Sequence, residues 1–174
     1  MDWYQTIIGV IDTRSFSSIW YWIVVAVLWS VSSYWVMGVP YDMLQKARRH
    51  GGQTQTDVET LAEIHARRLL DLSRQAAVPL FALVSFLLTS LAVLGFWYGI
   101  QLAQALFCLA LPMVPVGWLS LRTALKIEAG ENTGRALYHR LMYHRRSVQV
   151  VGMLAIFFTG MFGSYQIMHV TFLH

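Results

Sequence analysis

The sequence predicts an all-α, polytopic integral membrane protein with four transmembrane helices. Three observations predict this class. Charged residues make up 13% of the chain, hydrophobic residues make up 56%, and the charges leave long intervals of sequence free. Soluble proteins carry roughly 25% charged residues, so this composition provides too few charges for a water-exposed surface. Open strands leave backbone groups unpaired in lipid, and the apolar intervals are therefore expected to be helical.

The four transmembrane helices are predicted from three charge-free intervals. One interval separates Arg14 from Asp42, a second separates Arg74 from Arg122, and the third follows Arg146. The first and third each hold one span of roughly 20 residues, and the second is long enough for two. The predicted helices occupy about 17–38, 76–98, 101–121 and 148–171. Together they form a single membrane domain that covers residues 1–174.

Prolines and glycines predict the interruptions of these helices. Gly95 and Gly99 indicate the corner between the second and third spans. Pro79, Pro112 and Pro115 each remove a backbone donor, so kinks are expected near them.

Two hydrophilic segments, 42–74 and 122–146, are predicted to be helical as well. In the first, Gly51-Gly52 is expected to end one short helix, and the polar run 53–56 to act as a linker. Thr56 and Glu59 then have the spacing of a capping box, which predicts the start of a second helix that leads into the membrane.

The orientation follows from the placement of the cations. Twelve of the thirteen Lys and Arg residues lie in the two hydrophilic segments, and only Arg14 lies elsewhere. In a four-span topology both segments are on the same side, which the positive-inside rule makes the cytoplasmic side. Both termini are then expected in the periplasm of a bacterium, with the chain in its inner membrane.

The sequence does not favour an enzyme or a transporter. The predicted spans contain no Asp, Glu, Lys or Arg, whereas proton relays and ion-coupled transporters place such groups inside the membrane. The polar side chains inside the spans are expected to form hydrogen bonds between helices instead; besides scattered Ser and Thr they are Gln101, Gln104, Gln149 and Gln166. His139 and His144 are five residues apart, which does not align them for metal binding on one helical face, and Cys108 is the single cysteine. No catalytic, metal-binding or cofactor-binding residue is predicted, and no cofactor.

The basic residues of the hydrophilic segments are predicted to contact anionic phospholipid or an acidic partner. Tyr-His-Arg occurs twice within 138–145, next to the fourth span. The alternative is a collar of cations that fixes the topology and reaches the lipid phosphates. Because the membrane lies directly beside these residues, nucleic acid is not an expected ligand. The predicted contact residues are Lys46, Arg48, Arg49, Arg67, Arg68, Arg140, Arg145 and Arg146.

Small side chains at helical spacing in the fourth span predict close helix packing. Packing within the four-helix bundle and packing against another subunit both fit this pattern. The predicted packing residues are Ala155, Thr159, Gly160, Gly163 and Ser164.

Four short stretches of the sequence carry a family resemblance: Met1-Asp2-Trp3-Tyr4-Gln5, Arg14-Ser15-Phe16-Ser17, Gly38-Val39-Pro40-Tyr41-Asp42 and Ala47-Arg48-Arg49. They resemble a family of small alphaproteobacterial inner-membrane proteins described as a component of the SufBCD iron–sulfur assembly complex. The resemblance implies a bacterial inner-membrane location. Iron–sulfur scaffolds hold clusters through several cysteine thiolates, so a chain with Cys108 alone would serve such a complex as a membrane tether.

Three functional hypotheses follow. The first is a non-catalytic accessory or assembly subunit of a larger inner-membrane complex, with an energy-transducing (respiratory or photosynthetic) complex as the expected host and other membrane subunits as partners. The second is a membrane anchor that recruits a soluble cytoplasmic partner through its basic face. The third is a membrane protein that binds a small ligand or cofactor.

Overall fold

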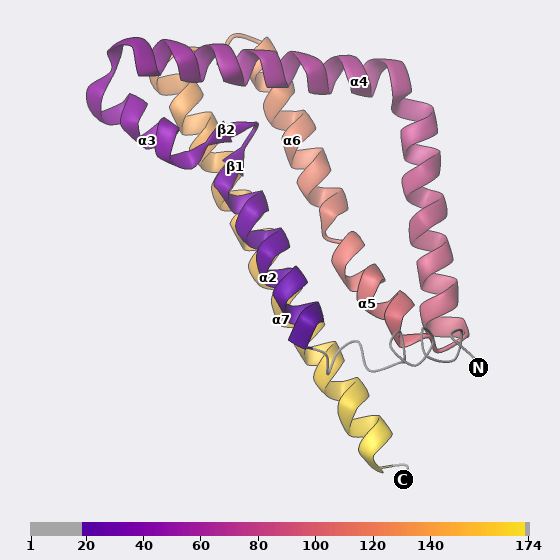
Figure 1. Cartoon of the computed structure of the whole chain (residues 1–174). Coiled ribbons are helices and arrows are strands. Elements are labelled where there is room, and N and C mark those ends of the chain that lie inside the picture. The colour runs from indigo at the N-terminus through magenta and orange to yellow at the C-terminus, as the bar shows by residue number, and fades with distance from the viewer. Residues whose placement is uncertain (1–18, 173–174) are drawn as a thin grey trace, which may run out of the picture.

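The computed structural model describes residues 19–172, which are almost entirely helical (Figure 1). Three helical stretches are long and apolar enough to cross a membrane, and a shorter apolar helix precedes them. The elements are α2 (Ile19–Tyr34), β1 (Trp35–Val36), β2 (Val39–Pro40), α3 (Tyr41–His50), α4 (Gly52–Ala92), the π-helix η2 (Val93–Trp97), α5 (Gln101–Ala110), α6 (Met113–Glu128) and α7 (Gly134–Phe172).

The first predicted helix, 17–38, is wrong at its C-terminal end. Residues 17 and 18 lie outside the described part of the chain, and α2 ends at Tyr34. Met37 and Gly38 both have positive φ values, 52° and 75°, so the chain reverses there and β1 pairs with β2 in an antiparallel hairpin. Gly38 also packs closely on His65, because a Cβ at this position would overlap the imidazole ring.

Helix α4 contains a sharp bend that divides it into two halves. The first half crosses the charged end of the molecule, and the second half runs away from that end (Figure 1). Ala76 has non-helical angles, φ −120° and ψ 21°. Pro79 explains the break, since it has no N–H for the carbonyl of Gln75 and its ring crowds that carbonyl. The predicted linker and capping box are wrong, because the helix already begins at Gly52 and the hydroxyl of Thr56 lies 3.5 Å from the Gly52 carbonyl.

The third predicted helix, 101–121, consists of two elements. Helix α5 ends at Ala110 and α6 begins at Met113, so the kink expected at Pro112 is confirmed. Helix α6 continues to Glu128, beyond the predicted span. The corner between α4 and α5 lies at η2 and Gly99, which has a φ of 71°.

Helix α7 has 39 residues and combines most of the hydrophilic segment 122–146 with the predicted fourth span, 148–171. The helix continues without a break because it contains no Pro. Along its length only the composition changes, from polar in the first part to apolar in the second.

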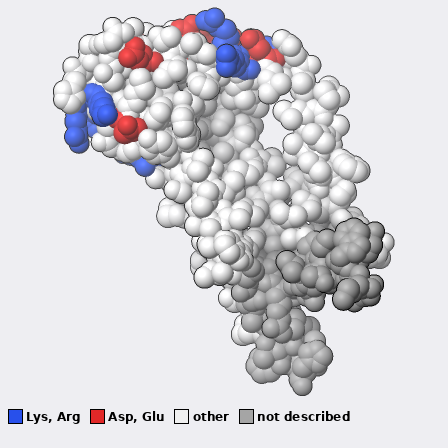
Figure 2. Space-filling view, viewed as in Figure 1, with Lys and Arg blue, Asp and Glu red and all other residues white. Residues whose placement is uncertain are grey.

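The charged residues gather at one end of the molecule (Figure 2). We call this end of the molecule the cap. It consists of the β hairpin, α3 and the first half of α4, together with the end of α6 and the start of α7 on which they lie. The cap holds the larger of the two buried apolar clusters, built around Val36, Leu44, Ala62, Ile127 and Leu141. Twelve cations and seven acids lie in the described residues, all of them in or beside the cap. The cap therefore has an excess of positive charge.

A smaller apolar cluster joins α2 to α7. Val25 and Trp29 of α2 are buried with Val148 of α7. Gly152 of α7 permits this contact, since a Cβ there would lie 2.7 Å from Cε3 of Trp29. The start of α2 and the end of α7 both lie on the side opposite the cap (Figure 1).

Candidate functional site

Two of the predicted contact residues, Arg140 and Arg145, are held by contacts within the chain. Arg140 donates two hydrogen bonds to the carboxylate of Glu131, at 2.5 and 2.8 Å. Arg145 donates from Nε to the Ser33 carbonyl at 3.1 Å, and its guanidinium carbon lies 3.5 Å from the centroid of the Tyr41 ring. Arg145 thus fastens α3 and the end of α2 to α7, which leaves less of its guanidinium for an outside ligand.

The other six predicted contact residues are exposed. Lys46 and Arg67 face acids one helical turn away, Asp42 at 4.0 Å and Glu63 at 2.6 Å. Such solvent-exposed pairs contribute little to stability. Arg49, Arg68 and Arg146 form no ion pair within the described residues.

Arg48 is exposed, but its side chain is held in place by Tyr138. Its Nη1 donates to the Tyr138 hydroxyl at 3.0 Å, and its guanidinium carbon lies 5.1 Å from the centroid of the Tyr138 ring. This contact joins α3 to α7 across the outer surface of the cap.

Two recesses meet at Tyr138 and His139. One is a cavity of about 530 Å³ with an apolar floor that includes Leu44 and Leu137 and a polar rim that includes Arg135. The other is a groove of about 740 Å³ along the outer side of α7. Sequence reasoning did not identify either recess, although the repeated Tyr-His-Arg indicated this part of α7.

An acid binds the start of α7 on the cavity side. Glu59 of α4 accepts a hydrogen bond of 2.7 Å from the backbone N–H of Gly134. A carboxylate at a helix N-terminus is favourable because it meets unpaired N–H groups and the positive end of the helix dipole. Glu59 therefore ties the first half of α4 to α7. Because its carboxylate is engaged there, Glu59 forms no ion pair with the described cations on the rim of the cavity.

The predicted packing residues of α7 lie at different depths. Thr159 and Gly163 are buried, and Ala155 is half-buried beside the cluster of Val25 and Trp29. Gly160 is half-buried with Trp22 nearby, whereas Ser164 is exposed. The structure therefore brings four of the five toward the interior of the chain. Gly152, which the sequence did not single out, approaches the Trp29 ring so closely that a Cβ there would lie 2.7 Å from Cε3.

A buried polar contact joins η2, α5 and α7 far from the cap. Gln104 donates from Nε2 to the Gly95 carbonyl at 2.8 Å and accepts at Oε1 from Nε2 of Gln166 at 2.6 Å. The expected interhelical hydrogen bonding is confirmed for Gln104 and Gln166, whereas the side chains of Gln101 and Gln149 form no hydrogen bond within the described residues. The π-helical turn changes the backbone pairing around Gly95, which explains why its carbonyl can accept from a side chain.

Among the described residues, no three His, Cys, Asp or Glu side chains lie close enough to hold a metal ion together. His144 is buried and its Nδ1 lies 3.1 Å from the Thr123 hydroxyl of α6, so this histidine joins two helices. Cys108 is half-buried in α5. The arrangement supports helix packing and surface contact.

No family model, curated protein or solved structure matches this chain. The resemblance to the alphaproteobacterial inner-membrane proteins therefore stays a prediction from the sequence.

Proposed function

We propose that this chain is a non-catalytic accessory or assembly subunit of a larger bacterial inner-membrane complex. In this proposal the chain crosses the membrane four times, with the cap in the cytoplasm and both termini in the periplasm. The single observation that carries it is the poor packing of the second half of α4 within the chain. No residue is buried in the most apolar 18-residue stretch of the helix formed by α4 and η2, whereas 17% and 22% of the residues are buried in the corresponding stretches of the other two long helices.

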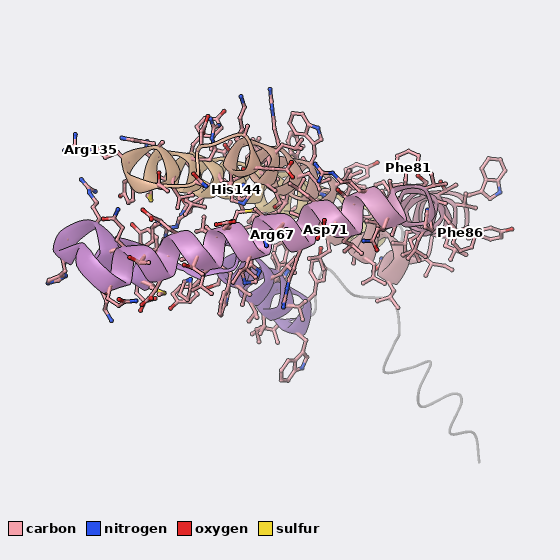
Figure 3. The ribbon with its side chains drawn as sticks, turned by 90° about the horizontal axis from the view of Figure 1, so that it is seen from above. Arg67, Asp71, Phe81, Phe86, Arg135 and His144 are labelled. Carbon is pink, nitrogen blue, oxygen red and sulfur yellow. The ribbon has the colours of Figure 1, made fainter. Side chains whose placement is uncertain are left out.

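The second half of α4 is attached mainly at its two ends. Near the cap, Arg74 donates two hydrogen bonds to Glu128 of α6, at 2.7 and 3.1 Å. At the opposite end, Gly95 of the adjoining η2 packs against Gln104 of α5. Between these attachments, Val78 is 80% exposed and Phe81 75% exposed. Figure 3 views this half end-on, with Phe81 and Phe86 at the edge of the molecule.

The sides of α4 and α6 that face each other are also incompletely packed. On α4, Val84 and Leu88 share a helical face with buried Gly95 but are only half-buried. On α6, Gly117 lies three turns before Glu128 on the same face, and a Cβ at Gly117 would meet no atom within 4 Å. We call these residues, with Leu121, the unpacked surface. A helix from another subunit can pack on it, since small residues allow close approach in lipid.

The positions of the charges and of α2 support the four-span topology. Helix α2 runs beside α7 from the cap toward the opposite end (Figure 1). Its 16 residues rise roughly 24 Å, close to the ~27–30 Å of a bilayer core. The excess of cations at the cap favours a cytoplasmic position for it.

The second candidate function is the membrane anchor for a soluble cytoplasmic protein. The cavity of about 530 Å³ between α3, α4 and α7 favours it, because this cavity lies in the cap and combines an apolar floor with the cations Arg48 and Arg135 on its rim. In that case a soluble protein, and no membrane subunit, should accompany the chain, and Leu44→Arg in the cavity floor should release it.

The test is purification of the tagged full chain from its native membrane in mild detergent, followed by mass spectrometry and an absorption spectrum of the same peak. The proposal expects stoichiometric membrane subunits. Gly117→Leu should remove them, because the added side chain has space in the isolated chain but would occupy the unpacked surface. Val27→Leu, on the exposed side of α2, is the matched control and should retain them. A lone peak with pigment or haem absorption would instead favour the small-ligand hypothesis.

A further inference from the structure

The groove on the outer side of α7 contains more positive charge than its own acid neutralises. Its cations include Arg48 from α3 and Arg140 and Arg146 from α7, and its acid is Glu131. Arg140 is bound to Glu131 through two hydrogen bonds, so these two charges balance. Arg48 and Arg146 remain as uncompensated cations in the same groove.

Both uncompensated cations have donors for an external anion. Arg48 uses one N–H on the Tyr138 hydroxyl, and a guanidinium has five such donors. The contact with Tyr138 fixes the direction of Arg48, which reduces the entropy that a ligand must remove. Arg146 is exposed and forms no hydrogen bond or ion pair within the described part of the chain.

The groove continues into an apolar stripe on the same face of α7. His139, Tyr143 and Arg146 follow one another at spacings of four and three residues, and the series continues at these spacings through Val150, Met153 and Phe157. Those three apolar side chains are exposed, Phe157 to 64%. Arg146 is the last charged residue before the charge-free part of α7, so it lies where the polar stripe becomes apolar.

We propose that this groove binds the headgroup of an anionic phospholipid. The phosphodiester lies between Arg48 and Arg146, Tyr143 borders the headgroup, and the acyl chains follow Val150, Met153 and Phe157 into the bilayer. A lipid fits better than an acidic soluble protein, because a single amphiphile meets both the basic and the apolar part of the stripe. The site does not depend on a partner complex, so it can be present or absent irrespective of the proposed subunit function.

Native mass spectrometry of the full chain in mild detergent tests this site. The protein is mixed with equal amounts of dioleoylphosphatidylglycerol and dioleoylphosphatidylcholine, and the lipid that stays bound is counted. We expect one preferentially retained phosphatidylglycerol. R48Q/R146Q should weaken its binding about thirty-fold, since a cation near an anionic headgroup contributes about 1 kcal/mol, or about fivefold, and two are removed. Arg67 and Arg68 were also predicted from the sequence to contact lipid, but they lie in the first half of α4, which contributes no residue to the groove. R67Q/R68Q removes the same formal charge as R48Q/R146Q and should leave binding in the groove unchanged.

Single substitution separates the site from the fold. R146Q removes a side chain without a described intrachain contact, so it should weaken phosphatidylglycerol binding about fivefold without lowering the unfolding temperature. Equal losses in R48Q/R146Q and R67Q/R68Q would overturn the proposal, because they would indicate general attraction to the cap. Displacement of the lipid by glycerophosphoglycerol at the same concentration would show a site for a free phosphodiester. Displacement by a glutamate-rich peptide would show a protein-docking groove.

Discussion

The contact between Trp29 and Gly152 predicts that adding one methyl group to α7 destabilises the protein. In Gly152→Ala the new Cβ would lie 2.7 Å from Cε3, 3.1 Å from Cδ2 and 3.3 Å from Cζ3 of the Trp29 indole. Carbon atoms in favourable contact are about 3.5–4.0 Å apart. The indole would therefore have to move by about 0.8 Å, away from a helix on which it is now buried.

The size of the effect follows from two opposing contributions. Overpacking of a close contact costs about 1–3 kcal/mol. An alanine in a helix interior is about 1 kcal/mol more favourable than glycine, so the net destabilisation by Gly152→Ala should be about 0–2 kcal/mol. Gly117→Ala is the matched control, because nothing lies within 4 Å of its Cβ and only the favourable contribution applies. The two variants should differ by about 1–3 kcal/mol.

The difference should be measured as thermal unfolding of the full chain in one mild detergent, followed by helical circular dichroism. For a domain of this size it corresponds to roughly 2–12 °C between the two variants. Adding Trp29→Leu to Gly152→Ala should reduce the cost of the alanine, because the crowded ring is gone. Equal unfolding temperatures for Gly152→Ala and Gly117→Ala, together with no coupling to Trp29→Leu, would refute the packing of α2 on α7.

Three further outcomes are expected. Gln104→Leu should lower the free energy of unfolding by about 1–3 kcal/mol, because it leaves the buried carbonyl of Gly95 without its side-chain donor. Gln166→Leu should lower it by about 0.6 kcal/mol, and SDS titration of the folded fraction measures both effects. Pro79→Ala should straighten the bend of α4, and spin-label distances across the bend should lengthen; unchanged distances would contradict the role given to the proline. The hydrogen bonds from Arg140 hold the pKa of Glu131 below its usual value of 4.5. The stabilisation by this pair is therefore complete above pH 4.5 and lost as the pH falls through the lowered pKa, and Glu131→Gln should remove that acid dependence from the unfolding temperature.

The sequence predicted the helical class and the position of most apolar segments, because lipid excludes charges and the charge-free intervals are visible without a structure. It also predicted the break at Pro112, whose missing N–H acts locally. It did not predict the hairpin after α2, since Met37-Gly38 lies in an apolar run without a common turn signal. That reversal depends on the packing of Gly38 against His65, which is far away in the sequence.

The candidate contact residues show the same division between local and long-range information. Counting cations placed the basic surface correctly at one end of the molecule (Figure 2). It could not distinguish Arg146, which is exposed, from Arg145, which is fastened to Ser33 and Tyr41. Adjacent residues on a helix point in different directions, and their partners come from distant parts of the chain. The groove beside Tyr138 therefore required the structure.

The most direct test of the subunit proposal is the composition of the native peak purified from mild detergent, compared between the natural chain and Gly117→Leu. The proposal expects stoichiometric membrane subunits with the natural chain and their loss from Gly117→Leu, with both chains equally well folded. A monodisperse single-chain peak from native membranes, with nothing accompanying it, would contradict the proposal.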